Sequence, residues 1–247
     1  MKIGNATSDQ GGRLADEGST TTAFVAGPPD SMTNTPTSRV FALAMILGPA
    51  VSLISTVVYV VGGGLNKDQA GGVIQIYGVV GYAIAIIGLL RLLERPMPRL
   101  SAALTVLGMV TVAAGLGFGN DSIVRAVNPD VALSQSHSAA ATLALVLPGL
   151  TFPLTWIGLG LALAKTGVIS RWSGFAIAAG GLLFPVARIP GIDALALVAD
   201  VVLLLGVVPI GLAILTGRQS GTPGTASIRT RLVAYDAPAV PLSAERT

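Results

Sequence analysis

The chain alternates long apolar runs with short polar connections. Long uncharged gaps of 16 to 27 residues, bounded by charged residues or by His137, recur in its central part, which is the pattern of a protein that crosses a membrane several times. Strands of a membrane barrel would be shorter and would alternate in polarity. The sequence therefore predicts an all-α integral membrane bundle of six transmembrane helices, at about 40–62, 69–90, 100–119, 138–164, 172–190 and 194–217.

Polar segments flank this apolar region at both ends. Residues 1–39 and 218–247 are rich in Gly, Ser, Thr and Pro and have no apolar periodicity, which predicts disordered tails around a transmembrane domain at 40–217. The first segment contains no apolar core of a signal peptide. Met32 stands just before the first helix and could be the start codon, which leaves open whether residues 1–31 are translated.

Composition excludes several kinds of catalytic site. The chain is 52% hydrophobic and 11% charged, whereas a soluble domain carries about a quarter charged residues. It has no cysteine and a single histidine, His137, which excludes disulfides, thiolate nucleophiles and a metal centre of several histidines within one chain. No lysine or histidine stands beside a serine inside the predicted helices. We therefore expect a non-enzymatic protein without catalytic residues, metal or cofactor.

Basic residues divide unevenly between the two sides of the predicted bundle. Twelve of the 15 Lys and Arg residues fall in the two tails and in the second and fourth connections, and three fall on the other side. The positive-inside rule then places both termini in the cytoplasm. Arginine outnumbers lysine, and Ala, Gly and Val are abundant, which is typical of a GC-rich bacterial genome. For a bacterial helical bundle we expect the inner membrane.

These charges have a topological explanation, so we expect no nucleic-acid partner. The expected partner is the lipid bilayer. Association with another membrane protein or with a second copy of the chain stays open, because the sequence gives no oligomeric state.

One charged residue, Asp200, interrupts the sixth apolar run. At helical rise it lies about 10 Å below the outer interface, where an unshielded carboxylate is costly. The uncharged fifth run, 172–187, has only 16 residues, so its helix must continue to about Pro190, which draws Arg188 into the membrane. We expect Arg188 to pair with Asp200 across the short fifth connection. The pair is either a clamp between adjacent helices or an ion or proton site.

Glycine and proline mark expected breaks in two of the predicted helices. Six helices divide into halves of three, and inverted repeats of transporters often break corresponding helices near the midplane to expose backbone to substrate. This pattern favours a transporter, although glycine and proline are also common in other membrane helices. The candidates are Gly48 and Pro49 in the first helix, and Pro148, Gly149 and Pro153 in the fourth.

Small residues also recur four positions apart, which allows two helices to approach closely. These pairs are Gly81 with Ala85, Gly158 with Ala162, and Gly174 with Ala178.

Residues 158–189 form a distinctive segment, GLGLALAKTGVISRWSGFAIAAGGLLFPVARI. An apolar helix leads into a turn, and the next helix contains a glycine pair; the turn and the pair are Lys165-Thr166-Gly167, Ser170-Arg171-Trp172 and Gly180-Gly181. The segment resembles a hairpin in uncharacterised bacterial multi-pass membrane proteins catalogued as a domain of unknown function. The resemblance covers 32 of 247 residues and implies neither an activity nor site residues.

Two functions remain as hypotheses. The first is a non-enzymatic accessory, sensor or assembly component of the membrane. The alternative is a small secondary transporter or a proton-coupled carrier that uses Asp200. A transporter needs a polar cavity near the midplane reached from one side, and the expected lining consists of hydroxyl residues on the first and fourth helices, namely Ser52, Ser55, Thr56 and Thr151.

Overall fold

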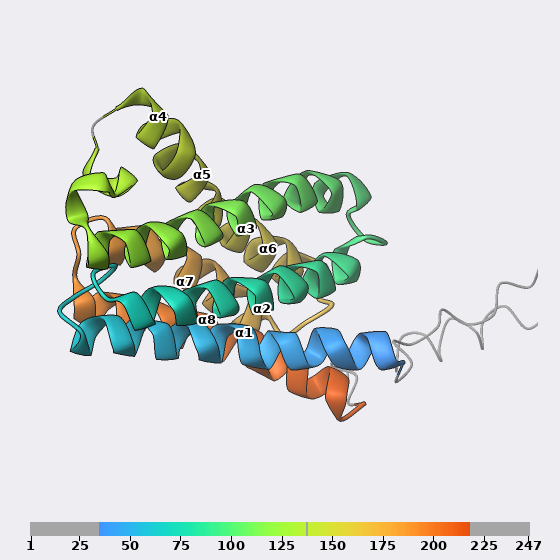
Figure 1. The fold of residues 1–247 in the computed structure, drawn as a ribbon. Helices are drawn as coiled ribbons and strands as arrows, with labels where there is room; N and C mark the ends of the chain where they lie inside the picture. The colour runs from blue at the N-terminus through green and yellow to red at the C-terminus, as the bar shows by residue number, and fades with distance from the viewer. Residues whose placement is uncertain (1–34, 137, 218–247) are drawn as a thin grey trace, which may run out of the picture. The chain divides into compact units, whose positions relative to one another are not determined.

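The described part of the chain consists of helices joined by short connections. The computed structural model describes residues 35–136 and 138–217, and no strand occurs within them. Six long helices dominate (Figure 1) and are α1 (Pro36–Val61), α2 (Gln69–Leu93), α3 (Pro98–Val127), α6 (Thr151–Thr166), α7 (Arg171–Arg188) and α8 (Asp193–Leu215). Shorter elements join α3 to α6 and are η1 (Pro129–Val131), η2 (Leu133–Gln135), α4 (Ala139–Ala141), the π-helical η3 (Thr142–Val146) and α5 (Leu147–Gly149).

Local sequence signals set where several helices begin and end. Thr35, Asp68 and Ser170 precede α1, α2 and α7, and each side chain accepts a hydrogen bond from the backbone N–H three residues later. Such caps satisfy backbone donors that have no partner within the helix. At the other end of α6, Gly167 has a φ of 68°, a left-handed conformation that glycine adopts without strain.

The long helices form a closed ring around an apolar core. Neighbours contact in the order α1, α2, α3, α6, α7, α8 and back to α1, while α2 also contacts α6 across the ring. The contact between α3 and α6 is the slightest around the ring, and a cavity described below lies there. The largest fully buried side chains of the core include Met45, Leu89, Trp156, Leu159, Ile177 and Leu203.

Glycines bring several pairs of helices into backbone contact, among them the pairs at Gly81 and Gly174. A Cβ atom added to Gly81 would lie 2.7 Å from the Cα of Gly48, so α2 and α1 touch there. A Cβ added to Gly174 would lie 2.7 Å from the carbonyl oxygen of Gly160, where α7 meets α6. The close contacts predicted from the small-residue spacing are therefore confirmed at Gly81 and Gly174. Gly158 instead faces the side chain of Leu104.

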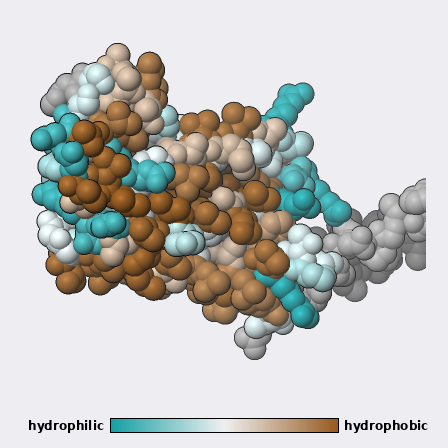
Figure 2. All heavy atoms as spheres, in the orientation of Figure 1, coloured by the Kyte–Doolittle hydropathy of each residue, from teal (hydrophilic) through white to brown (hydrophobic). Residues whose placement is uncertain are grey.

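Within residues 35–136 and 138–217, five helical segments are long and apolar enough to cross a membrane, which agrees with the predicted membrane class. They are α1, α2, α3, the combined segment Ala139–Thr166 and α8. The sixth expected span, α7, has 18 residues and is bounded by Arg171 and Arg188, and it is not among the five. Figure 2 shows hydrophobic residues over most of the drawn face and hydrophilic residues gathered toward its two ends.

Several helix boundaries differ from those expected from sequence. Helix α1 begins at Pro36, inside the expected tail, and α7 ends at Arg188 rather than near Pro190. Helix α3 continues to Val127, so the connection expected from residue 120 is helical at its start. The charge of Asp121 was a poor loop signal because its carboxylate is buried and accepts a hydrogen bond from the Ser134 backbone N–H. Residues 1–34 and 218–247, which carry most of the expected tails, and His137 lie outside the described residues.

The expected helix breaks are realised unequally. Helix α1 runs without interruption through Gly48 and Pro49, so the expected break is absent there, and Gly48 serves the contact with α2 instead. The fourth span departs from α geometry in η3 and turns at Leu150 after Pro148 and Gly149. Pro153 lies in the first turn of α6, where its missing N–H costs least. The corresponding spans of the two halves therefore differ, since the fourth span is interrupted and the first is not.

We expect Gly81→Ala to lower the free energy of unfolding by about 1–3 kcal/mol, because its Cβ would meet the backbone of α1 and force two helices apart. The matched control is Gly117→Ala in α3, where a Cβ would meet only a Leu145 side-chain carbon, at 3.5 Å. Alanine favours helix over glycine, so this control should be neutral or stabilising. Thermal unfolding in detergent measures both, and equal melting temperatures would contradict the close contact of α1 with α2.

Candidate functional site

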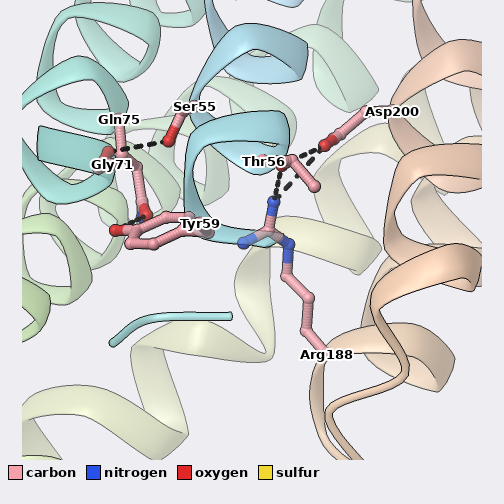
Figure 3. Close-up of polar contacts among 7 residues, drawn as sticks. All are labelled: Ser55, Thr56, Tyr59, Gly71, Gln75, Arg188 and Asp200. Atoms are coloured by element: carbon pink, nitrogen blue, oxygen red, sulfur yellow. Dashed lines mark hydrogen bonds and ion pairs between the residues drawn. The ribbon is translucent and has the colours of Figure 1, made fainter. Parts of the chain in front are cut away.

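Three polar side chains from three helices meet inside the ring (Figure 3). Arg188, at the end of α7, donates from Nη2 to the Thr56 hydroxyl of α1 at 2.7 Å. The same Nη2 lies 3.4 Å from Oδ2 of Asp200 on α8. The Thr56 hydroxyl in turn donates to that carboxylate oxygen at 2.5 Å. We call these three residues the polar triad.

Burial explains why the polar triad must be fully connected. Asp200 is 1% exposed and Thr56 is 0% exposed, while the Arg188 side chain is 12% exposed. A buried carboxylate requires a paired charge and further hydrogen bonds to offset its lost hydration. Arg188 and Thr56 supply these, and they join α7, α8 and α1, which are neighbours in the ring.

The predicted contact between Arg188 and Asp200 is therefore present. It arises because the connection between α7 and α8 is short, as the sequence indicated. Helix α7 ends at Arg188, and α8 begins after a short turn at Asp193. In that turn Gly191 has a φ of 72°. Sequence reasoning missed Thr56 as the third member. The available signal was a hydroxyl within an apolar run, which could equally have served a substrate cavity.

An aromatic wall continues from the guanidinium of Arg188. Its Cζ lies 4.5 Å from the ring centroid of Phe184, a cation–π arrangement. Phe184 stacks on Phe152 of α6 with ring centroids 4.0 Å apart. Phe152 also lies 6.1 Å from Trp156 and 6.2 Å from Tyr82. The guanidinium of Arg188 is thus held by Thr56 and Asp200 on one side and by the stacked rings of Phe184 and Phe152 on another.

A second set of polar contacts joins α1 to α2 and α3. The Ser55 hydroxyl donates to the carbonyl oxygen of Gly71 at 2.8 Å, and the Tyr59 hydroxyl donates to Oε1 of Gln75 at 2.8 Å. The amide nitrogen of Gln75 lies 3.5 Å from the carbonyl oxygen of Gly115. Figure 3 shows the contacts of Ser55 with Gly71 and of Tyr59 with Gln75, which join α1 to α2.

A cavity of about 360 Å³ adjoins these contacts, and Ser55, Gln75 and Gly115 are among the residues that line it. Arg188 alone carries a charge among the described residues that line it. Asn66, in the connection between α1 and α2, also lines the cavity, so the cavity extends toward the end of the ring where α1 ends. The lining includes Ser52, Ser55, Gln75 and Thr111 as polar residues, and Phe118, Val146, Leu150, Phe152, Phe184 and Ile189 as apolar ones.

The hydroxyl residues expected to line a transport cavity separate into three groups. Ser52 and Ser55 line the cavity, whereas Thr56 belongs to the polar triad. Thr151 donates to the carbonyl oxygen of Pro148 at 2.5 Å and accepts from Thr111 at 3.0 Å. Among the expected helix breaks, Gly149 and Pro153 line the cavity, and Gly48, Pro49 and Pro148 do not.

Metal ligands do not gather in the described part of the chain. No group of three or more His, Cys, Asp or Glu side chains able to hold a metal ion occurs among the residues described. The chain matches no protein-family model, no curated protein and no solved structure. The polar triad and the adjoining cavity are therefore the observations on which a function has to be argued.

Removing one partner of a buried ion pair leaves the other charge uncompensated, at a cost of about 3–5 kcal/mol, whereas replacing both by apolar residues is often nearly neutral. We therefore expect Asp200→Asn and Arg188→Leu each to lower thermal stability in detergent more than the double variant Asp200→Leu, Arg188→Leu. Equal stability of single and double variants would show that Arg188 and Asp200 are not energetically coupled.

Proposed function

We propose that this protein is a multi-pass integral membrane protein of six helices that binds a small molecule without transforming it, as a sensor or accessory component. The observation that carries the proposal is the cavity of about 360 Å³ with Arg188 as its one charged lining residue among those described. Ligand sites are typically concave, mostly apolar, about 300–1,000 Å³ in volume, and contain a few polar groups that fix orientation. The cavity fits this description.

The cost of the buried charges supports a ligand-binding role. A clamp between α7 and α8 needs only packing, which apolar side chains provide at no desolvation cost. Ionisable residues inside a membrane domain more often mark a pathway or a binding site. Here Arg188 borders the cavity directly, which is what a binding role requires and a purely structural clamp does not.

The chemistry of the lining supports binding rather than catalysis. Its described side chains include hydroxyls, amides, aromatic rings and one guanidinium. A guanidinium remains protonated in proteins and is a poor proton carrier. General acid–base catalysis needs a group that exchanges a proton near neutral pH, and the lining residues do not offer one.

A carrier is the second candidate, favoured by the irregular segment beside the cavity. Gly149 and Pro153 line the cavity where η3 and α5 depart from a regular α-helix, and broken helices of transporters lie at substrate sites. Asp200 is 1% exposed and does not line the cavity. A proton-coupled mechanism through Asp200 would therefore require the polar triad to open during each cycle.

We further propose that both termini lie in the cytoplasm of a bacterial cell and that the protein resides in the inner membrane. Lys and Arg support this orientation because most of the basic residues outside the tails lie in or beside the connections between α2 and α3 and between α6 and α7. Trp172 is 85% exposed at the start of α7 and fits an aromatic anchor at the cytoplasmic interface. The cavity then faces the external side.

Ligand retention through purification tests the proposed function. We expect the protein purified in mild detergent to retain a small molecule that organic extraction and mass spectrometry detect in near-stoichiometric amount. Ser52→Phe, which places a ring in the cavity, should lose most of it.

The matched control is Val57→Phe, on the same helix but 45% exposed on its outer face. It should retain the molecule as the unmodified protein does. Identical extracts from all three proteins would contradict a ligand-binding cavity.

A further inference from the structure

We infer that the ligand is a small amphipathic carboxylate, bound by the N–H groups of Arg188 that the polar triad leaves unused. This inference rests on the proposed function and names the ligand class for the same cavity. The apolar body of the ligand would lie against the rings of Phe118, Phe152 and Phe184, all of which line the cavity.

The hydrogen bonds of Arg188 are distributed unevenly over its guanidinium. Both contacts of the polar triad, to Thr56 and to Asp200, are made by Nη2. Nε and Nη1 have no hydrogen-bond partner among the described residues, and neither is a fully buried atom without a partner. Since Arg188 lines the cavity, we take these N–H groups as the donors that a ligand in the cavity can reach.

The orientation of Arg188 is fixed before a ligand arrives. Thr56 and Asp200 hold Nη2, and Phe184 covers one face of the guanidinium at 4.5 Å. An arginine that is already ordered loses little conformational entropy when it binds, so more of the interaction energy appears as affinity. Asp200 thus acts as a positioning residue for Arg188.

Charge and shape together select a carboxylate. Guanidinium N–H groups form short, strong hydrogen bonds with carboxylate oxygens, and no acidic side chain among the described residues lines the cavity to repel an anion. A cationic ligand would meet the positive charge of Arg188. Most of the remaining lining is apolar, which favours a ligand with an apolar body over a small hydrophilic anion.

Three probes with the same apolar body test this inference, namely 4-phenylbutyrate, 4-phenylbutanol and 4-phenylbutylamine. Oleate serves as a fourth probe for a carboxylate that enters from the bilayer rather than from water. The protein is placed in nanodiscs of phosphatidylcholine, in a Trp172→Phe background that leaves Trp156, 6.1 Å from Phe152, as its one tryptophan. The change in Trp156 fluorescence as each probe is added gives the dissociation constant of that probe.

We expect a carboxylate probe to bind at least about tenfold more tightly than the alcohol, and the amine to bind more weakly still. Binding of 4-phenylbutyrate indicates an aqueous source, and binding of oleate alone indicates the bilayer. Asp200→Asn keeps Arg188 but removes the charge that positions it, so it should weaken binding of the acid while keeping its preference over the alcohol. The double variant Arg188→Gln, Asp200→Asn should lose the preference for the acid.

The possible failures are distinguishable. If none of the probes binds the Trp172→Phe protein, the proposed cavity site fails together with the inference. If alcohol, amine and acid bind equally, the cavity binds ligands but the carboxylate assignment is wrong. If the acid binds the double variant as tightly as it binds Asp200→Asn, Arg188 is not its anchor, and the inference is overturned.

Discussion

The structure depends on the burial of the Asp200 carboxylate between three helices. Asp200 is 1% exposed, and an unpaired charge at that position would oppose folding by several kcal/mol. Its partners come from two other helices, so α1, α7 and α8 must lie together before the charge is compensated. The same requirement holds the Arg188 side chain, at the end of α7, beside the cavity.

The cavity lies beside the pair of neighbouring helices that contact each other least. Glycine contacts draw α1 against α2 and α6 against α7 until their backbones touch, whereas α3 and α6 contact each other only slightly. Near this junction α3 also contacts η3 and α5. The cavity, of about 360 Å³, therefore lies where the ring is least tightly packed, and the polar triad stabilises the helices at its border.

Much of the fold could be predicted from sequence because the lengths of the apolar runs indicate helices that can cross a membrane. The Arg188–Asp200 pair could also be predicted, since the short connection between α7 and α8 limits where the two side chains can lie. The third member, Thr56, could not, because it is separated by 132 residues from Arg188 and its pairing depends on the ring order. Gly48 and Pro49 misled for a related reason: a sequence cannot distinguish a helix break from a close helix contact.

A single introduced cysteine tests the central claim most directly, namely that a cavity open to the external side adjoins the polar triad. The chain contains no cysteine, so Ser52→Cys creates a unique thiol in the cavity lining, and Val57→Cys creates one on the outer face of the same helix. We expect a membrane-impermeant thiol reagent added outside intact cells to label Ser52→Cys and to leave Val57→Cys unlabelled. Failure to label Ser52→Cys, or equal labelling of both variants, would contradict the account.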